Sequence, residues 1–409
     1  MYNTVFVLLI GVLVFGYVLE RILDKLNLSH TLPVLPEELS GIFDPEEYQK
    51  SQMYKRDNIR FSFITSSIGL LVMLLLFFLG LFGWYDDLIT GISSSYIVHV
   101  LIFFGTFALI SDILTTPFDL YSTFVLEERY GFNRTTVRTY IIDKLKAWLI
   151  GAIMGGGLLA LITWIYMLTG KWFWLIALGL VTLVSLFLMM FYSNLIVPLF
   201  NKQTPLEEGS LRGKIEEFAL KAGFKLNNIY VMDGSKRSSK ANAYFTGLGP
   251  KKRIVLFDTL IEDLEEEEIV AVLAHEVGHY KFKHTTTGLI LGTMQTALMF
   301  YLFSLFVGVD SFAVALGGAE ASFHLGLVAF GVLYSPISML TGLLTNALSR
   351  HNEYQADNFA KDKYEAGSLI SSLKKLSKNN LSNLTPHPAY VFFHYSHPPL
   401  LQRIRSLKK

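Results

Sequence analysis

The sequence predicts a mainly α-helical integral membrane protein that carries a small α/β domain. Three observations support this fold class. Hydrophobic residues make up 52% of the 409 residues and charged residues only 17%, whereas soluble domains contain about 25% charged residues. Seven long apolar runs contain no lysine or arginine. Two polar segments show the mixed helix and strand patterns of a compact α/β unit.

The composition also excludes several kinds of site. The chain has no cysteine, which rules out disulfides, thiol nucleophiles and thiolate metal ligands. Any zinc ion must therefore be held by histidine and carboxylate side chains. The formal net charge is +1, which does not favour a nucleic-acid partner. The partner that the composition predicts is the lipid bilayer.

Seven apolar runs have about the length of 20 residues that a helix needs to cross the hydrocarbon core. Pro198 at the end of one run and Pro336 inside another predict bends in those helices. One such run is compatible with a buried helix of a soluble protein, but seven predict seven transmembrane helices. The runs lie at about 4–20, 63–84, 97–115, 147–168, 172–198, 287–309 and 324–348.

Basic residues between the runs predict the orientation of the chain. Arg21 and Lys25 follow the first run and no basic residue precedes it, which predicts an uncleaved anchor with an external N-terminus. The loops expected outside contain only Lys171 as a basic residue. By the positive-inside rule, the polar segments 199–286 and 349–409 both lie in the cytosol. The membrane is then a bacterial inner membrane or that of the endoplasmic reticulum.

The chain is expected to divide at about residue 200. Residues 1–200 form an N-terminal membrane domain with five transmembrane helices and cytosolic loops. Residues 201–409 form a second domain, which a transmembrane hairpin at about 287–348 interrupts. In the tail of this domain, 350–365 has a helical pattern and Lys374–Asn383 is expected to be a polar loop.

The segment before the hairpin alternates helix and strand signals, which predicts a small α/β unit. Its second helix begins with several glutamates, where the positive end of the helix dipole favours acidic residues. The patterns predict helices at Leu211–Ala222 and from about Asp263 to Lys283, strands at Asn228–Met232, Ala241–Phe245 and Ile254–Phe257, and a turn at Gly247–Lys252.

The second helix contains the sequence His275-Glu276-Val277-Gly278-His279. Four residues advance an α-helix by a little over one turn, so the two histidines lie on one face and can bind one zinc ion. Glu276 is placed to act as general base toward a water at that ion. The alternative is a helix with two unrelated histidines at the membrane surface. The apolar residues before the motif, which predict a buried helix face, favour the metal site.

A catalytic zinc ion needs a third protein ligand and one open position. Glu353 is the best candidate, because it begins a helix after the last apolar run, on the same side as the two histidines. Asp357 lies one turn further on and is expected to orient a zinc-bound histidine through its second ring nitrogen. His351 is the alternative third ligand. An ordinary surface carboxylate is the alternative interpretation of Asp357.

Three other polar residues need an interpretation. His397 in the polar tail can donate a hydrogen bond to a developing oxyanion, or it can cap the last helix. Asn242 lies on a predicted strand, where an exposed edge can pair with an extended peptide; the alternative is a simple turn residue. His284 lies about 140° around the helix from His279 and is interpreted as structural.

Together these residues resemble the type I CaaX prenyl proteases, which are membrane metalloproteases with seven spans. The similarity covers essentially the whole chain. Lys240 and Ala241 depart from the Ser-Asn-Ala-Tyr strand of that family. The stretches that carry the resemblance are Phe43–Ser51, Arg60–Phe63, Phe124–Asn133, Pro198–Lys202, Pro205–Glu207, Ser239–Tyr244, Glu353–Asp357 and Ser396–Leu400, together with the zinc motif.

The resemblance implies seven helices that enclose a large chamber within the membrane and are capped by the zinc domain. It also implies removal of the aaX tripeptide from farnesylated or geranylgeranylated CaaX proteins, which their lipid holds at the membrane. The implied site comprises one zinc ion bound by His275, His279 and Glu353, with Glu276 as the catalytic residue and Asn242 and His397 beside the substrate.

Two other functions stay open at this point. A broad quality-control protease of the HtpX type uses the same zinc chemistry on other membrane-associated proteins, but the additional spans and the N-terminal loops favour the prenyl proteases. A transporter or scaffold with structural zinc would need a closed site with four ligands. Only His351 is available as a weak fourth ligand.

Overall fold

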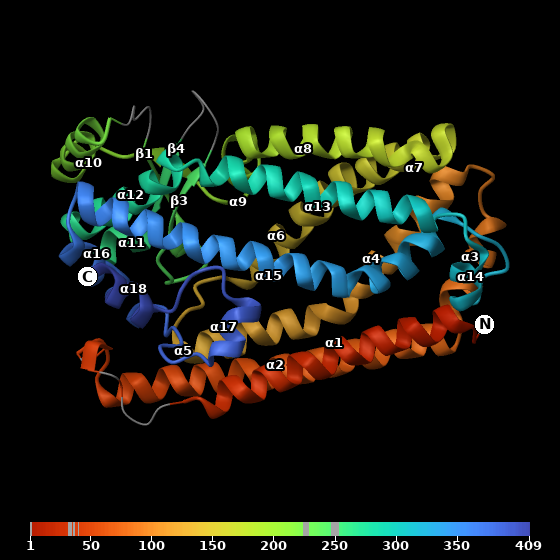
Figure 1. The fold of residues 1–409 in the computed structure, drawn as a ribbon, viewed down its shortest axis with the longest axis horizontal. Coiled ribbons are helices and arrows are strands. Elements are labelled where there is room, and N and C mark those ends of the chain that lie inside the picture. The colour runs from red at the N-terminus through yellow and green to blue at the C-terminus, as the bar shows by residue number, and fades with distance from the viewer. Residues whose placement is uncertain (1, 32–34, 36, 40, 224–228, 247–252) are drawn as a thin grey trace.

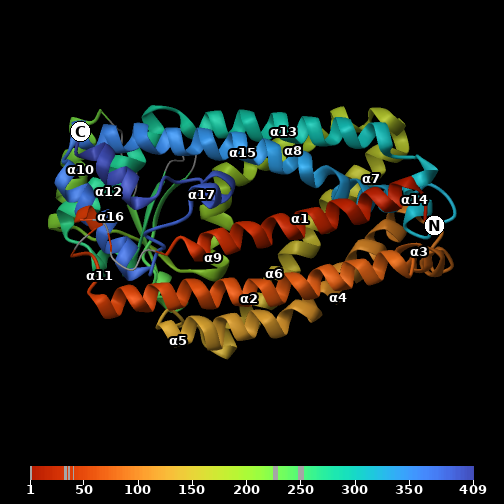
Figure 2. The same cartoon turned by 60° about the horizontal axis from the view of Figure 1, so that its bottom comes forward.

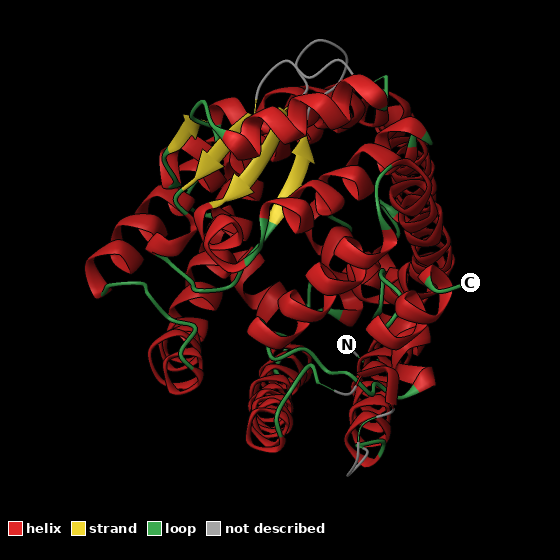
Figure 3. Ribbon diagram, turned by 90° about the vertical axis from the view of Figure 1, so that its left-hand side faces the viewer, coloured by secondary structure: helices red, strands yellow, loops and turns green. Residues whose placement is uncertain are grey.

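The computed structural model describes residues 2–31, 35, 37–39, 41–223, 229–246 and 253–409. Long helices lie nearly side by side along the molecule, and a small sheet with shorter helices lies at one end of them (Figure 1). Seen from that end, the sheet lies to one side of the helical bundle (Figure 3). The predicted combination of a helical membrane protein with a small α/β unit is confirmed.

The long helices are α1 (Thr4–Ser29), α2 (Pro45–Phe78), α4 (Tyr96–Tyr121), α6 (Val137–Ile150), α7 (Gly157–Thr169), α8 (Phe173–Leu195), α13 (His284–Phe306) and α15 (Phe323–Lys363). The shorter helices are α3 (Leu81–Thr90), α5 (Glu128–Tyr130), α9 (Val197–Phe200), α10 (Ser210–Lys221), α11 (Asp258–Asp263), α12 (Glu266–Lys281), α14 (Asp310–Ala315), α16 (Ala366–Asn379), α17 (Pro388–His394) and α18 (Leu400–Leu407). The strands are β1 (Gln203–Pro205), β2 (Ile229–Met232), β3 (Ala243–Thr246) and β4 (Arg253–Phe257).

Six helical stretches of the described residues are long and apolar enough to cross a membrane. The longest, Val137–Phe200, breaks at Gly170, where a φ of 54° ends α7, and α8 packs back against α7. Two crossings within this stretch would give the seven that the sequence predicts. Helix α8 ends at Leu195, shortly before Pro198, whereas Pro336 lies inside the uninterrupted helix α15.

The polar segments before and after the last hairpin meet at one end of the bundle. The N-terminus, α3 and α14 lie at the opposite end (Figures 1 and 2). A hydrogen-bonded cluster joins three helices there, because Asp86 on α3 accepts from Nε2 of His99 on α4 at 2.6 Å and from Nε2 of His324 on α15 at 2.7 Å. These separations are typical of hydrogen bonds. They are shorter than the roughly 3.3 Å between ligand atoms around a tetrahedral zinc ion.

The small domain is built on a four-stranded sheet with the order β1-β2-β4-β3. Strands β2 and β4 are parallel, and the two outer strands pair antiparallel to them, so β3 is an edge strand. Helices α10 and α12 pack on the sheet through a core that includes Ile215, Ile254 and Leu273. The predicted helix and strands lie close to the observed ones. Asn228 and the turn Gly247–Lys252 lie outside the described residues.

One predicted loop is wrong. Most of Lys374–Asn383, expected as a polar loop, belongs to helix α16. Leu369, Leu373 and Leu376 recur at helical spacing and pack into the core of the small domain. This apolar face outweighs the many serines and lysines around it, because burial of a helix face depends on periodicity more than on mean polarity.

Candidate metal centre

Helix α12 brings the two histidines of the motif to its contact with α15. Glu265 and Glu268 form a capping box that satisfies backbone N–H groups at the start of the helix. The apolar residues Ile269 to Ala274 are largely buried against the sheet and α10. This burial fixes the rotation of the helix. His275 is buried and His279 is half-buried where α12 meets α15.

Glu353 lies on α15, the helix that also contains the last apolar run. The expectation that Glu353 begins a new helix is therefore wrong, because α15 continues without interruption from Phe323 to Lys363. A helix of 41 residues extends about 60 Å, which is twice the thickness of the hydrocarbon core. Its last turns project from the membrane beside α12, and Glu353 on them is buried.

Three side chains converge where the two helices meet. The Nε2 atoms of His275 and His279 are 3.1 Å apart, and the carboxylate oxygens of Glu353 lie 3.4 Å from the first and 3.2 Å from the second. Zinc bonds of about 2.0–2.1 Å in a tetrahedral arrangement separate neighbouring ligand atoms by about 3.3 Å. Oε2 of Glu353 is buried without a hydrogen-bond partner among the described residues. The spacing and this unsatisfied oxygen fit a zinc ion held by three residues.

Asp357 connects the first histidine to a partly buried arginine. Oδ1 of Asp357 accepts a hydrogen bond from Nδ1 of His275 at 2.9 Å, which leaves Nε2 of His275 to face the ion. Arg403 on α18 donates to both carboxylate oxygens, at 2.9 and 2.6 Å. Burial lowers the pKa of His275, but the hydrogen bond with Asp357 and the nearby carboxylate of Glu353 outweigh burial and raise this pKa to about 9. The carboxylates therefore make the site favourable for a positive charge.

A second chain of hydrogen bonds supports His279. Its Nδ1 lies 2.9 Å from Nδ1 of His284, and Nε2 of His284 lies 2.9 Å from Oε1 of Gln355. The amide oxygen accepts from His284, so Nδ1 of His284 can accept from His279 and leave Nε2 of His279 free for a metal. The interpretation of His284 as a structural residue pointing away from the ligands missed this contact.

The remaining predicted residues differ in how near they lie to the three candidate ligands. Nε2 of His397 lies 3.3 Å from Oε1 of Glu353, and its side chain is largely exposed. Glu276 is half-buried between the two histidines along α12. Asn242 is exposed at the start of the edge strand β3, and its backbone carbonyl accepts from the N–H of Phe257. No contact joins Asn242 to the ligands within the described residues.

Lys240 anchors the loop that leads into β3. Its amino group donates to the hydroxyl of Tyr54 at 2.9 Å and to Glu127 at 2.8 Å, and it lies 4.3 Å from the ring centre of Phe132. Tyr54 lies on α2 between two of the stretches that resemble the prenyl proteases, and Glu127 and Phe132 lie in the stretch Phe124–Asn133. The departure at Lys240 therefore supplies a cation between the membrane domain and the residues that lead through Asn242 into β3.

A pocket of about 340 Å³ opens beside His279, between α13 and α15. Gly288 and Gly292 form part of its wall, and an added Cβ at either position would meet nothing within 4 Å. Thr345 and Leu348 of α15 line the opposite side. A ligand can therefore reach the metal centre from between two membrane-spanning helices.

Gly278 permits the close approach of α12 and α15. A Cβ at this position would lie 3.0 Å from Cα of Ala356 and 3.2 Å from its carbonyl oxygen, so the helices would have to separate. We expect Gly278→Ala to weaken zinc affinity by about tenfold or more, because Ala356 is one turn from Glu353. Competition with a chromogenic chelator measures this affinity. Gly213→Ala on α10, where a Cβ meets nothing, is the control, and equal affinities in both variants would contradict the prediction.

Two family models match the chain. The model described as CAAX prenyl protease N-terminal, five membrane helices, matches residues 25–202, and that of peptidase family M48 matches residues 205–409. The CAAX prenyl protease 1 homolog of Arabidopsis thaliana is 36% identical over 97% of this chain and 96% of its own length. For CAAX prenyl protease 1 of Saccharomyces cerevisiae these values are 35%, 96% and 91%. The crystal structure of S. mikatae Ste24p matches with a TM-score of 0.94 at 31% identity, covering 100% of both chains.

Proposed function

Because this chain belongs to peptidase family M48 and carries the membrane domain of the CAAX prenyl proteases, we propose that it removes the aaX tripeptide from prenylated CaaX proteins. The protein is a multi-pass integral membrane metalloendopeptidase. The observation that carries the proposal is the convergence of two histidines and one glutamate beside a pocket between membrane-spanning helices.

The proposed metal is one zinc ion held by His275, His279 and Glu353. The spacing of the three ligand atoms and the absence of cysteine support zinc in a site of nitrogen and oxygen donors. When bound, zinc polarises the scissile carbonyl and lowers the pKa of a coordinated water. Asp357 and His284 hold the two imidazoles in the tautomers that leave Nε2 free.

Glu276 is the proposed general base. Its place between the two histidines lets its carboxylate accept a proton from the attacking water and return it to the leaving amine. His397, whose exposed ring lies beside Glu353, is proposed to donate to the oxyanion that develops on the carbonyl. Asn242 is proposed to hold the extended peptide at the free edge of β3.

The proposed substrate is anchored in the same membrane as the enzyme. A prenyl chain keeps the CaaX terminus at the bilayer surface, and the pocket beside His279 opens between two of the helices that cross that bilayer. We propose that the metal centre lies on the cytosolic side, as the distribution of basic residues favours. We also propose that the catalytic domain, residues 201–409, includes the transmembrane hairpin.

The proposed function is tested with two CaaX peptides that differ only in farnesylation. The purified protein should cleave the farnesylated peptide after the modified cysteine with a kcat/KM at least about tenfold higher, because burial of only two methylene equivalents contributes about 1.6 kcal/mol. A zinc chelator should abolish cleavage, and added zinc should restore it. Equal turnover of the two peptides would instead indicate a broad quality-control protease.

A further inference from the structure

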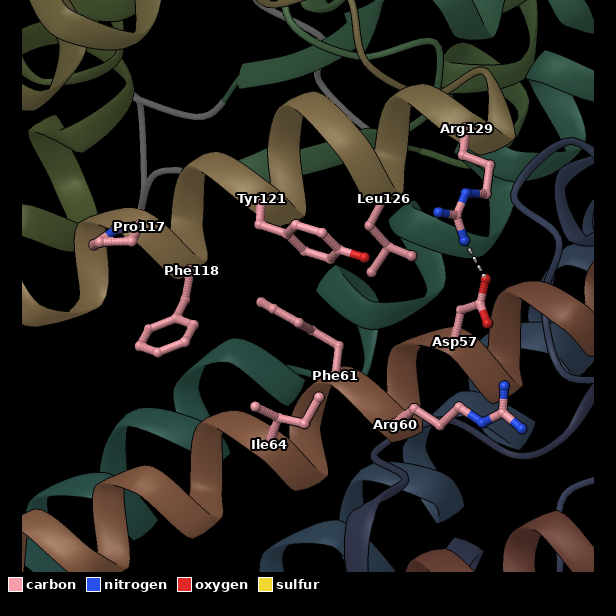
Figure 4. A pocket seen from close by; sticks show the side chains of 9 residues that line it. All are labelled: Asp57, Arg60, Phe61, Ile64, Pro117, Phe118, Tyr121, Leu126 and Arg129. Carbon is pink, nitrogen blue, oxygen red and sulfur yellow. Dashed lines mark hydrogen bonds and ion pairs between the residues drawn. The ribbon is translucent and has the colours of Figure 1, made fainter.

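A groove lies between α2 and the end of α4, and none of the residues that line it belongs to the candidate metal centre. Side chains of the two helices point toward each other across it, and an ion pair between Asp57 and Arg129 closes one end (Figure 4). The groove has a volume of about 520 Å³, and a second pocket of about 460 Å³ continues it along α2. The first is lined mainly by apolar residues, Phe61, Ile64, Pro117, Phe118, Tyr121 and Leu126; the second adds Lys50, Met53, Arg56 and Tyr130.

The groove is on the lipid-facing side of α2. At 100° per residue, Arg60 and Ile64 share one face of this helix with Leu71, Leu75 and Phe78, and all five are exposed. The exposed apolar face of a membrane-spanning helix turns to lipid, and a polar face turns to protein or to a water-filled interior. The opposite face of α2 carries the polar residues Ser51, Lys55, Asn58, Ser62, Thr65 and Ser66.

The charged end of the groove has more cations than anions. Asp57 already accepts from Arg129 at 3.0 Å and from the hydroxyl of Tyr130 at 2.8 Å. Arg56 and Arg60 are exposed, and no residue in the described ranges forms an ion pair with either. They lie where α2 enters its apolar run, which is the level of lipid headgroups. An anionic group is therefore the missing partner at this position.

We propose that the groove binds one anionic glycerophospholipid. Its phosphate lies between Arg56, Arg60 and Arg129, and one acyl chain follows the apolar groove past Ile64 and Tyr121. Guanidinium groups bind phosphate oxygens through paired N–H donors. A zwitterionic lipid would fill the apolar part but would leave the excess positive charge unmatched. The lipid would fix α2 against α4 at the membrane surface without entering the reaction.

The test is native mass spectrometry of the full-length protein from vesicles of equal phosphatidylglycerol and phosphatidylcholine. The wild type should retain one phosphatidylglycerol in preference to phosphatidylcholine. The double variant Arg56→Gln/Arg60→Gln should lose this preference by about 25-fold, since each basic residue at an anionic surface contributes about fivefold. Arg138→Gln, an exposed arginine at the start of α6, is the control and should retain the preference.

A second variant tests the apolar groove separately. Ile64→Trp keeps every charge but fills the space beside Phe118, so it should also reduce retention of phosphatidylglycerol. Equal retention of the two lipids by the wild type, or an unchanged preference in the double variant, would overturn the proposal. It would also be wrong if the double variant retained its lipid but showed a raised KM for a farnesylated peptide, because the groove would then bind substrate.

Discussion

Glu276→Gln is expected to lower kcat for a farnesylated CaaX peptide by about 10³-fold while zinc content stays at one ion per chain. Glutamine has nearly the same size as glutamate but cannot accept a proton from water, and general-base catalysis contributes about 10²- to 10⁴-fold. The metal is retained because none of the three converging ligands changes. Steady-state kinetics with parallel metal analysis by mass spectrometry measures both quantities.

The matched control for this variant is Glu267→Gln on the same helix. Glu267 is exposed and pairs with Lys214 near the start of α12, so its replacement should change kcat less than twofold. Activity of Glu276→Gln within about tenfold of wild type would remove Glu276 as general base. Loss of zinc in that variant would show that Glu276 helps to hold the metal.

Glu353→Ala is expected to reduce zinc affinity by at least about 10²-fold and to abolish peptide cleavage. The change removes one of the three proposed protein ligands, and two histidines on one helix turn form an incomplete site. It also removes a buried carboxylate whose Oε2 lies 3.6 Å from Nη1 of Arg403, so the remaining charges are less well balanced. Asp357 then becomes the main counter-charge of both Arg403 and His275.

Zinc affinity of this variant is measured by competition with a chelator of known affinity. The control is Asp362→Ala, which removes an exposed carboxylate further along α15 and should leave metal content unchanged. A fully metallated and active Glu353→Ala protein would mean that the third ligand is another residue.

Much of the fold can be predicted because membrane insertion imposes simple patterns. Runs of about 20 apolar residues without basic side chains mark spanning helices, and those predicted lie mainly on helices of the structure, although two of them extend past the ends of α2 at Phe78 and α13 at Phe306. The failure at α16 has a physical reason as well. Three leucines at helical spacing bury one face there, although the segment is polar on average.

The metal centre is predictable where its residues lie on one helix and not where they come from distant segments. The spacing of His275 and His279 follows from helix geometry. Arg403 carries no local signal, because its role depends on α18 packing against the carboxylates of α15. The signal that could have found it is the pair of carboxylates, Glu353 and Asp357, which share one buried helix face and therefore need a cation as a partner. The contact of His284 with His279 depends on the bend at Lys283, whose φ is 58°.

Glu353, the proposed third ligand, lies near the end of the long uninterrupted helix α15. Glu353 lies 30 residues, or about 45 Å, from the start of this helix at Phe323. A rotation of one degree about that start moves the carboxylate by about 0.8 Å over this length. Helices adjust their inclination to the thickness of the bilayer. Helix α12 packs on the same last turns of α15, at Ala356 and Phe359, and Asp357 on these turns holds His275. The histidines are therefore expected to move together with Glu353, which protects the distances within the proposed metal centre when bilayer thickness changes.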